Sequence, residues 1–493
     1  MKKRILSMLL VCVMMLSVVA CNADPNNEQT TKAPTESTAP PPVDVTTAAP
    51  EETAPVRDVA DLPDKYDLDG FNLRILIIQN AANAGAMATL APDALNAEVL
   101  NDAMYNRNAA MKEKYNFEMT NIEANNVLNT LTNSILSQED AYDVALPYFN
   151  TAIAKISEGY FVDLTTLPHL NLEKNYWDQN FNESTSFFNK QYFAVGDIMV
   201  ADDDVLLMFM YNSALGKDLG IENLYTAVEE GRWTYELMTK YAQSANNDLN
   251  GDSVMNDKDR YGYFWANNNC IFPHFAATGT SLIVRDENDM PVLNKNLEKV
   301  YAVWDIVYDL LDQERNSIDW MTFQDQKSGI ISMISGKQVL FQNMILSQVR
   351  RLYRDIPTDF GLLPMPKYDE KQDTYYSSVW KSFSTLCVPT SNTHQAETGF
   401  VIEALASASE EINPAYYDVC LASKYTRDPE SSAMIELTRK NVIYDLAWIY
   451  DWGKLGTSIN TAAAKREGQL ATVYASFSLV AQNEATAFAQ KQK

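Results

Sequence analysis

Short apolar runs alternate with longer amphipathic segments in the first part of the chain. The run FNLRILII follows an Asp69-Gly70 turn and has the length and apolar content of a buried strand. Strands that alternate with helices favour an α/β domain with a largely parallel sheet. The predicted strands cover 71–78, 117–120 and 142–146, and the predicted helices cover 91–115 and 124–138.

The pattern changes twice further along the chain. A strongly apolar strand is predicted at Val205–Tyr211, and a helix-rich region follows to about Asp325. A second αβ pattern lies between Gly336 and Leu363, where KQVLFQN and DFGLLPMP have the composition of strands. Helical spacing dominates from about Gln395 onward. The part of the chain from 62 to 493 is large for one simple core, so we expect two domains or lobes.

The first residues have the pattern of a secretion signal with a lipid-attachment site. Three basic residues precede an apolar run that ends in Val18-Val19-Ala20-Cys21. The run is shorter than the roughly 20 residues that a membrane-spanning helix needs. The sequence therefore predicts a signal peptide at 1–20 and lipidation of Cys21. The alternatives are an uncleaved anchor and a plain secretory signal in which the cysteine occurs by chance.

Residues 21–61 form the predicted spacer that follows the lipidated cysteine. Its Pro, Thr, Glu and Ala residues offer almost nothing to bury, so we expect it to be disordered and semi-extended. The threonines are also possible sites for O-glycans. Such a spacer suits a globular body tethered outside the cytoplasmic membrane.

Charge and cysteine usage exclude several classes of protein. The formal net charge of −26 opposes binding to nucleic acid and direct electrostatic binding to anionic lipid. Outside the N-terminal segment only Cys270, Cys387 and Cys420 remain, an odd and widely spaced set that could contain one bridge at most. No C-x-x-C, phosphate loop or G-x-S-x-G motif occurs.

Segments spread over nearly the whole body resemble the extracellular solute-binding lipoproteins of ABC importers. The resemblance is to the carbohydrate-type group, the family 1 solute-binding proteins, which are common in Gram-positive bacteria. The order and spacing of the segments carry it, and none of them is a catalytic signature. They are YDLDGFNLRILI, FAVGDIMV, LLMFMYNSALGKDLGI, GRWTYELMTKYAQ, DLNGDSVMNDKDRYGY, GKQVLFQN, FGLLPMPKYDE and NPAYYDVCLASKYTRDPES.

The resemblance implies a two-lobed fold of the periplasmic-binding-protein type, α/β in class. Its lobes would be discontinuous and joined by a hinge, with a helix-rich second lobe and the ligand in the cleft between them. The implied boundaries are 62–207 with 338–384 for lobe 1, and 208–337 with 385–493 for lobe 2. The chain would cross between lobes near Val205–Tyr211, Gly336 and Ser382–Pro389.

One local motif has the spacing of a calcium-binding loop. Oxygen-bearing residues fall at positions 1, 3, 5, 9 and 12 of a twelve-residue segment, which is a pattern that a hard cation prefers. Ser253 replaces the usual glycine, and an aspartate replaces the usual final glutamate. The sequence favours a structural Ca²⁺, and the alternative is a solvated turn. The predicted ligands are Asp248, Asn250, Asp252, the carbonyl of Val254, Asn256, Asp257 and Asp259.

Aromatic and polar residues near the expected crossings are candidates for a sugar site. Sugar rings stack on aromatic faces, and their hydroxyls pair with carboxylates and amides. Any single tryptophan is more often part of a core, so the group carries more weight than its members. The candidates are Tyr148, Trp177, Asp178, Asp203, Asp204, Trp265, Asn267, Trp320, Asn343 and Trp380.

The resemblance implies a monomeric, non-enzymatic binding protein on the extracytoplasmic face of the cell membrane. It would capture a carbohydrate, of oligosaccharide size, and deliver it to the permease subunits of an ABC transporter, with contact to the membrane through the lipid alone. Two alternatives stay open. A surface glycoside hydrolase needs a pair of carboxylates across a cleft, which no motif places here. A ligand-binding sensor or adhesin would share every feature except the partner.

Overall fold

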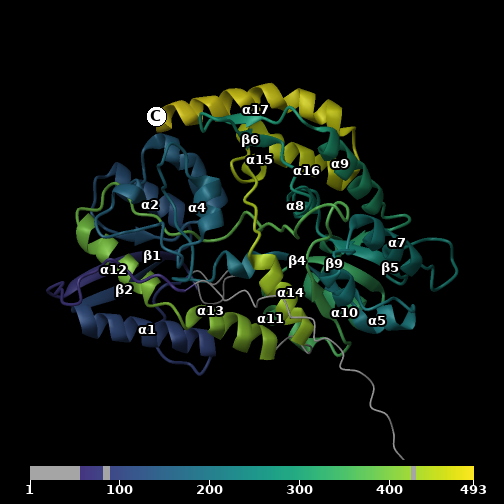
Figure 1. Cartoon of the computed structure of the whole chain (residues 1–493), viewed down its shortest axis with the longest axis horizontal. Helices are drawn as coiled ribbons and strands as arrows, with labels where there is room; N and C mark the ends of the chain where they lie inside the picture. Colours follow the sequence, from purple (N-terminus) through teal and green to yellow (C-terminus); the bar gives the residue numbers. More distant parts are fainter. Residues whose placement is uncertain (1–55, 81–88, 424–428) are drawn as a thin grey trace, which may run out of the picture. The chain divides into compact units, whose positions relative to one another are not determined.

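The predicted strand at 71–78 is the centre of a small parallel sheet in the computed structural model, which describes residues 56–80, 89–423 and 429–493. The strand order is β2-β1-β3, with β1 at Phe71–Ile78, β2 at Phe117–Ala124 and β3 at Val144–Ala145. β1 runs parallel to both neighbours. The helices α1 (Val99–Tyr115) and α2 (Val127–Leu136) connect the strands, which confirms the predicted α/β pattern (Figure 1).

Helix α1 begins later than the predicted start at residue 91. The backbone N–H of Asn96 donates to the carboxylate of Asp102, and the backbone N–H of Glu98 donates to the side chain of Asn96. Side chains that bond to nearby backbone in this way compete with helix formation. The segment before Val99 is therefore a set of turns.

A second, mixed sheet contains five strands in the order β10-β4-β9-β5-β8. β5 is parallel to β8 and β9, whereas β4 is antiparallel to β9 and β10. The helices α5, α7 and α10 pack near these strands (Figure 1). The bounds are β4 (Leu207–Tyr211), β5 (Tyr261–Trp265), β8 (Ser317–Asp319), β9 (Val339–Ile345), β10 (Gly361–Leu363), α5 (Ser213–Asp218), α7 (Tyr235–Ala245) and α10 (Gln326–Ser335).

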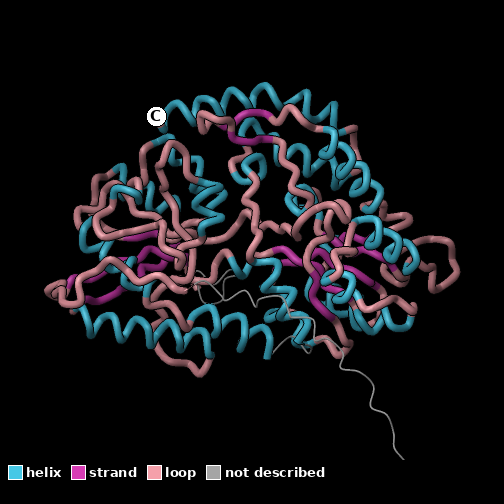
Figure 2. Tube along the Cα trace, in the orientation of Figure 1, coloured by secondary structure: helices cyan, strands magenta, loops and turns pink. Residues whose placement is uncertain are grey.

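Helices and loops make up nearly all of the described chain outside these sheets (Figure 2). A two-stranded antiparallel pair, β6 (Ile283–Arg285) and β7 (Pro291–Leu293), packs against α17. The other α-helices are α3 (Phe149–Ala152), α4 (Gln179–Thr185), α6 (Leu224–Glu229), α8 (Phe272–Ala277), α9 (Glu298–Leu310), α11 (Ser347–Arg351), α12 (Gln395–Ser407), α13 (Ile412–Pro414), α14 (Pro429–Arg439), α15 (Leu446–Ile449), α16 (Leu455–Lys465) and α17 (Leu470–Gln492).

The strand pairing differs from the sequence assignment of 338–384 to the first lobe. β9 and β10 pair with β4 and β5, not with the small parallel sheet. The segment 379–389 instead runs from one sheet to the other, because Val379 bridges to Leu206, whereas Cys387 bridges to Ala145. Apolar patterning marks a strand but does not encode its partner, so the sequence could not settle this pairing.

The folded body begins before the predicted end of the spacer. Arg57 forms an ion pair with Asp197 and also donates to the carbonyl of Ala406 at 2.9 Å. The backbone N–H of Asp58 donates to the side chain of Asn175 at 2.8 Å. Residues from Val56 onward therefore belong to the same compact unit as the rest of the body. The predicted signal peptide and Cys21 lie outside the described residues.

Two further sequence expectations concern the membrane and the cysteines. Within the described ranges, no helix combines the length and the apolar character that crossing a bilayer requires. Cys270, Cys387 and Cys420 are all buried, and the described structure shows no disulfide among these three residues.

Candidate functional site

A hollow lies at the edge of the five-stranded sheet where the parallel strands β5, β8 and β9 end. In α/β sheets this carboxyl edge is the usual place for a ligand. β4 is antiparallel, so its first residues reach the same edge beside the end of β9. The empty volume of the hollow is about 420 Å³ including its open part. We call it the amide hollow; its lining is Leu207, Ala266, Asn268, Asn269, Trp320, Asn343, Met344, Ile345, Gln348 and Trp380.

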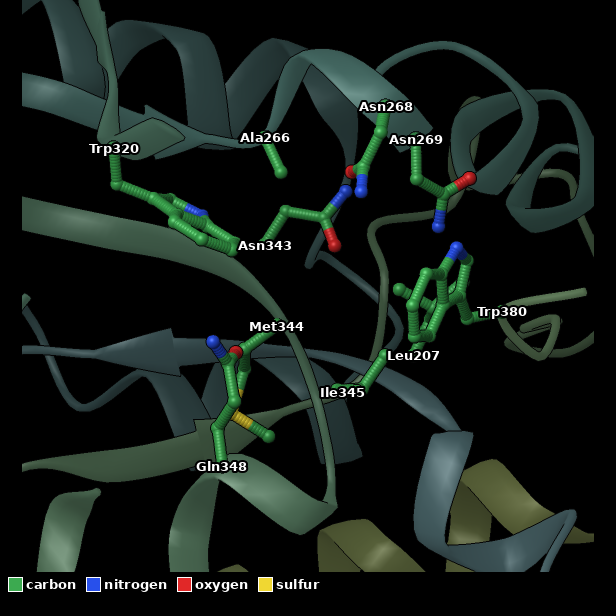
Figure 3. Close-up of a pocket in the computed structure, with 10 residues that line it drawn as sticks. All are labelled: Leu207, Ala266, Asn268, Asn269, Trp320, Asn343, Met344, Ile345, Gln348 and Trp380. Atoms are coloured by element: carbon green, nitrogen blue, oxygen red, sulfur yellow. The ribbon is translucent and has the colours of Figure 1, made fainter. Parts of the chain in front are cut away.

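Two tryptophans stand on opposite sides of the amide hollow (Figure 3). All eight tryptophans of the chain lie in the described ranges, and six of them are buried, with at most 7% of their surface exposed. Only Trp320 and Trp380 are partly exposed. Trp320 directly follows β8, where the Asp319 carboxylate caps a short turn by accepting from the Met321 N–H at 2.9 Å. Trp380 is fixed by its backbone N–H, which donates to the Val205 carbonyl at 3.0 Å.

Four side-chain amides complete the polar part of the hollow. Asn268, Asn269 and Asn343 lie between the two indoles, and Gln348 lies near Met344 (Figure 3). Asn269 is only 7% exposed, yet its Oδ1 has no hydrogen-bond partner among the described residues. The indole N–H of Trp320 is buried and unpartnered in the same way. Buried polar groups are nearly always paired, so two unpartnered atoms in the wall of one hollow are unusual.

The turn that carries the asparagines is held by a helix from the far end of the chain. Asn460, on α16, accepts from the backbone N–H of Cys270 at 3.0 Å and donates to the carbonyl of Asn267 at 2.9 Å. Asn267 was a predicted site residue, but its neighbours Asn268 and Asn269 line the hollow instead. The run of three asparagines directly after a strand was the signal for this turn. Nothing in the sequence pointed to Asn460 or Gln348.

The lining suits a ligand with both apolar and hydroxyl-bearing surfaces. Indole faces offer apolar contact, whereas each amide has two N–H donors and a carbonyl acceptor. None of the described residues that line the amide hollow has an ionisable side chain. The site therefore has the means to hold a neutral polyhydroxylated molecule by stacking and neutral hydrogen bonds.

A second hollow lies at the carboxyl edge of the small parallel sheet. It is lined by Ile78, Asn125, Asn126, Val127, Leu128, Asn129, Leu146, Tyr148, Thr151 and Ser384. Tyr148, a predicted site residue, is therefore placed here and not in the amide hollow. Ser384 follows Trp380 by only four residues, so an extended chain separates their Cα atoms by at most about 14 Å. The segment between the sheets thus contributes a residue to each hollow.

Two predicted tryptophans are part of the core. Trp177 is 1% exposed, and its indole N–H donates to Glu403 at 3.2 Å. Trp265 is fully buried in β5, and its indole N–H donates to the hydroxyl of Ser317 at 3.0 Å. Neither ring lines the hollow. The apolar strand that places Ala266 and the asparagines at the sheet edge points the Trp265 ring into the interior.

The predicted carboxylates bond to other parts of the protein, and only Asp204 is buried, whereas Asp178 and Asp203 are partly exposed. Asp178 caps α4 by accepting from the Phe181 N–H at 2.9 Å, and it accepts from Tyr444 at 2.9 Å. Asp204 is fully buried and accepts from Arg350 at 2.9 Å.

Asp203, the third of these carboxylates, accepts from the hydroxyl of Tyr417. Burial raises the pKa of Asp203 to about 6, against the lowering effect of nearby Arg439. Asp178, Asp203 and Asp204 thus lie away from both hollows.

The loop at 248–259 is closed by its own hydrogen bonds. Asp248 accepts from the N–H groups of Gly251 and Ser253, and Asp259 accepts from those of Leu249 and Asn256. Asn250, Asp252 and Val254 accept hydrogen bonds within the same turns. The backbone carbonyl of Asp257 accepts from the side chain of Gln338, outside the loop, at 3.0 Å. Among the residues that the structure describes, no group of three or more His, Cys, Asp or Glu side chains is placed to hold a metal. Carboxylate oxygens keep free lone pairs in such turns, so calcium stays a prediction.

Comparison with known proteins identifies the fold. No protein-family model and no curated protein matches the sequence. The solved structures that it resembles include carbohydrate-binding proteins of ABC transporters, whose matches cover about 86% of the chain. The chain therefore has the α/β fold of the periplasmic binding proteins.

Three of these structures illustrate the likeness. An ABC substrate-binding protein from Listeria monocytogenes, solved with cycloalternan, matches at a TM-score of 0.54 with 12% identity, over 86% of this chain and 99% of its own. A galacto-N-biose/lacto-N-biose I-binding protein from Bifidobacterium longum matches at 0.53 with 13% identity, over 86% and 97%. An ABC transporter solute-binding protein from Thermotoga lettingae, bound to α-D-tagatose, matches at 0.53 with 13% identity, over 85% and 100%.

Proposed function

We propose that this chain is an extracytoplasmic solute-binding protein that captures a carbohydrate and delivers it to the permease of an ABC importer. One observation carries the proposal. The only two partly exposed tryptophans of the chain line one hollow, together with four amides, at the carboxyl edge of a sheet. Stacking faces beside amide donors and acceptors are what a sugar ring requires.

The position of the hollow supports the same proposal. It lies next to the segment that joins the two sheets, and in two-lobed binding proteins a ligand is enclosed when the lobes close about such connections. Similar solved structures of this fold are named as binding proteins of ABC transporters. Capture and release need no bond to be broken, so we expect no catalytic turnover.

Isothermal titration of the full chain with neutral oligosaccharides tests the proposal. We expect a one-to-one complex with at least one sugar, which is recovered unmodified afterwards. Recovery of cleaved sugar would instead establish a glycoside hydrolase. Absence of binding to sugars, with binding to peptides, would refute the carbohydrate part of the proposal.

We further propose that the protein is tethered to the membrane through a diacylglyceryl group on Cys21. The basic start, the short apolar run and the small residues before the cysteine support this. Expression in a Gram-positive host should place the wild-type chain in the membrane fraction. Cys21→Ala should move it to the medium or leave it unprocessed, and an unchanged membrane fraction with full processing would exclude the lipid anchor.

A further inference from the structure

The proposed function does not use one feature of the two hollows, which is that their described lining carries no charged side chain. A fifth of the chain is charged, 21% of its residues, and its net charge is −26. Yet none of the described residues that line the amide hollow or the second hollow is an Asp, Glu, Lys, Arg or His. In the second hollow the phenol of Tyr148 is the only ionisable group among them.

The charged residues next to the amide hollow in sequence all have other partners. The Asp319 carboxylate accepts from the Met321 N–H and is 3% exposed. The guanidinium of Arg350 is bound to Asp204. The ammonium of Lys381 lies over the ring of Trp448, 3.5 Å from its centroid. Each of these three charged groups therefore has a partner within the protein, and none of the three residues lines the amide hollow.

Building on the proposed function, we infer that this site selects uncharged carbohydrates and rejects glycans that carry a carboxylate, phosphate, sulfate or ammonium group. A charged group that enters the hollow loses its hydration and finds no opposite charge there. Neutral hydroxyl and acetamido groups instead find amides that both donate and accept. Asn268, Asn269, Asn343 and Gln348 supply the amides of this neutral kind.

The net charge of the whole protein and the uncharged lining of the hollow predict different selectivities, so an experiment can separate these two causes. A net charge of −26 repels anionic glycans but attracts cationic ones, and salt screens this effect beyond a Debye length of about 8 Å. Desolvation inside the hollow penalises both signs and changes little with salt. Rejection of a cationic glycan therefore identifies the lining, and not the overall field, as the cause.

The experiment titrates the full chain with matched series of trisaccharides built on glucose, galactose and N-acetylglucosamine. Each neutral trimer is paired with its uronic acid form, and the N-acetylglucosamine trimer also with its de-acetylated, cationic form at about pH 6. We expect binding to be confined to neutral members, with charged partners at least about 100-fold weaker at low and high salt. A charged trimer that binds as tightly as the best neutral one overturns the inference while the proposed function stands. Absence of measurable binding by every trimer overturns the proposed function itself.

Variants test the role of the lining directly. Asn343→Asp and Gln348→Glu each introduce a carboxylate of nearly unchanged shape into the amide hollow. We expect the ratio of cationic to neutral trimer affinity to rise at least about tenfold in either variant, as the new charge gains a partner. Asn288→Asp, on the exposed turn between β6 and β7, adds the same charge elsewhere and should leave the ratio unchanged. An equal ratio in all three variants would show that the hollow does not hold the ligand.

Discussion

Removal of either indole from the amide hollow should weaken sugar binding without unfolding the protein. Trp320 and Trp380 are partly exposed, so a ligand can cover one face of each ring. Covering about 100 Å² of indole at about 25 cal/mol per Å² contributes about 2.5 kcal/mol, which corresponds to a Kd about 70-fold higher on truncation. Trp320→Phe keeps a flat aromatic face and should retain much of the affinity.

The stability of the same variants separates binding from folding. Truncation of a partly exposed ring leaves a smaller enclosed cavity than truncation of a buried one. Trp320→Ala and Trp380→Ala should therefore lower the free energy of unfolding by about 1–2 kcal/mol. Trp265 is fully buried, and its truncation should lower that free energy by about 3–5 kcal/mol. Titration calorimetry with the tightest neutral sugar and urea unfolding measure the two effects. Wild-type affinity in both alanine variants at the hollow would refute the stacking argument.

Three further predictions concern stability. Burial raises the pKa of the Asp445 carboxyl from 3.8 to about 6. Between these values the folded state holds a proton that the unfolded state has released. The free energy of unfolding should therefore fall by about 3 kcal/mol as pH rises from about 4 to above 6. Asp445→Asn keeps the helix cap and should flatten this part of the pH profile in urea melts; an unchanged slope contradicts the assignment. A Cβ at Gly262 would lie 2.0 Å from the carbonyl oxygen of Ala242. Gly262→Ala should therefore lower the free energy of unfolding by about 1–3 kcal/mol. A neutral effect would show that α7 can shift away from β5. If the loop at 248–259 binds calcium, EDTA should lower the melting temperature of the wild type, and Asp248→Ala should abolish this effect. A wild-type melting temperature that does not change with EDTA would refute the calcium prediction.

The local patterns in the first part of the chain were sufficient for its strands and for the α/β class, whereas β5 and β8 lie in the stretch that was predicted to be helix-rich. The predicted strand at 71–78 coincides with β1, since a short and mostly apolar run after an Asp-Gly turn is typical of a strand. The α/β class followed from alternation alone, and the order of segments along the body indicated the fold that the solved structures share. Trp320, Asn343 and Trp380 were named as site residues from the sequence, and the structure brings these three together in one hollow.

Only the tertiary structure decided which strands are partners and which aromatic rings reach a ligand. β9 joins β4 and β5 across long stretches of chain, a choice made by packing and not by local pattern. Trp265 and Trp320 both lie near strand ends, yet one ring is enclosed in the core and the other lines the hollow. Asn460 reaches the asparagine turn from a helix near the end of the chain. The sequence alone determines what each segment can form, whereas burial depends on neighbours that are distant along the chain.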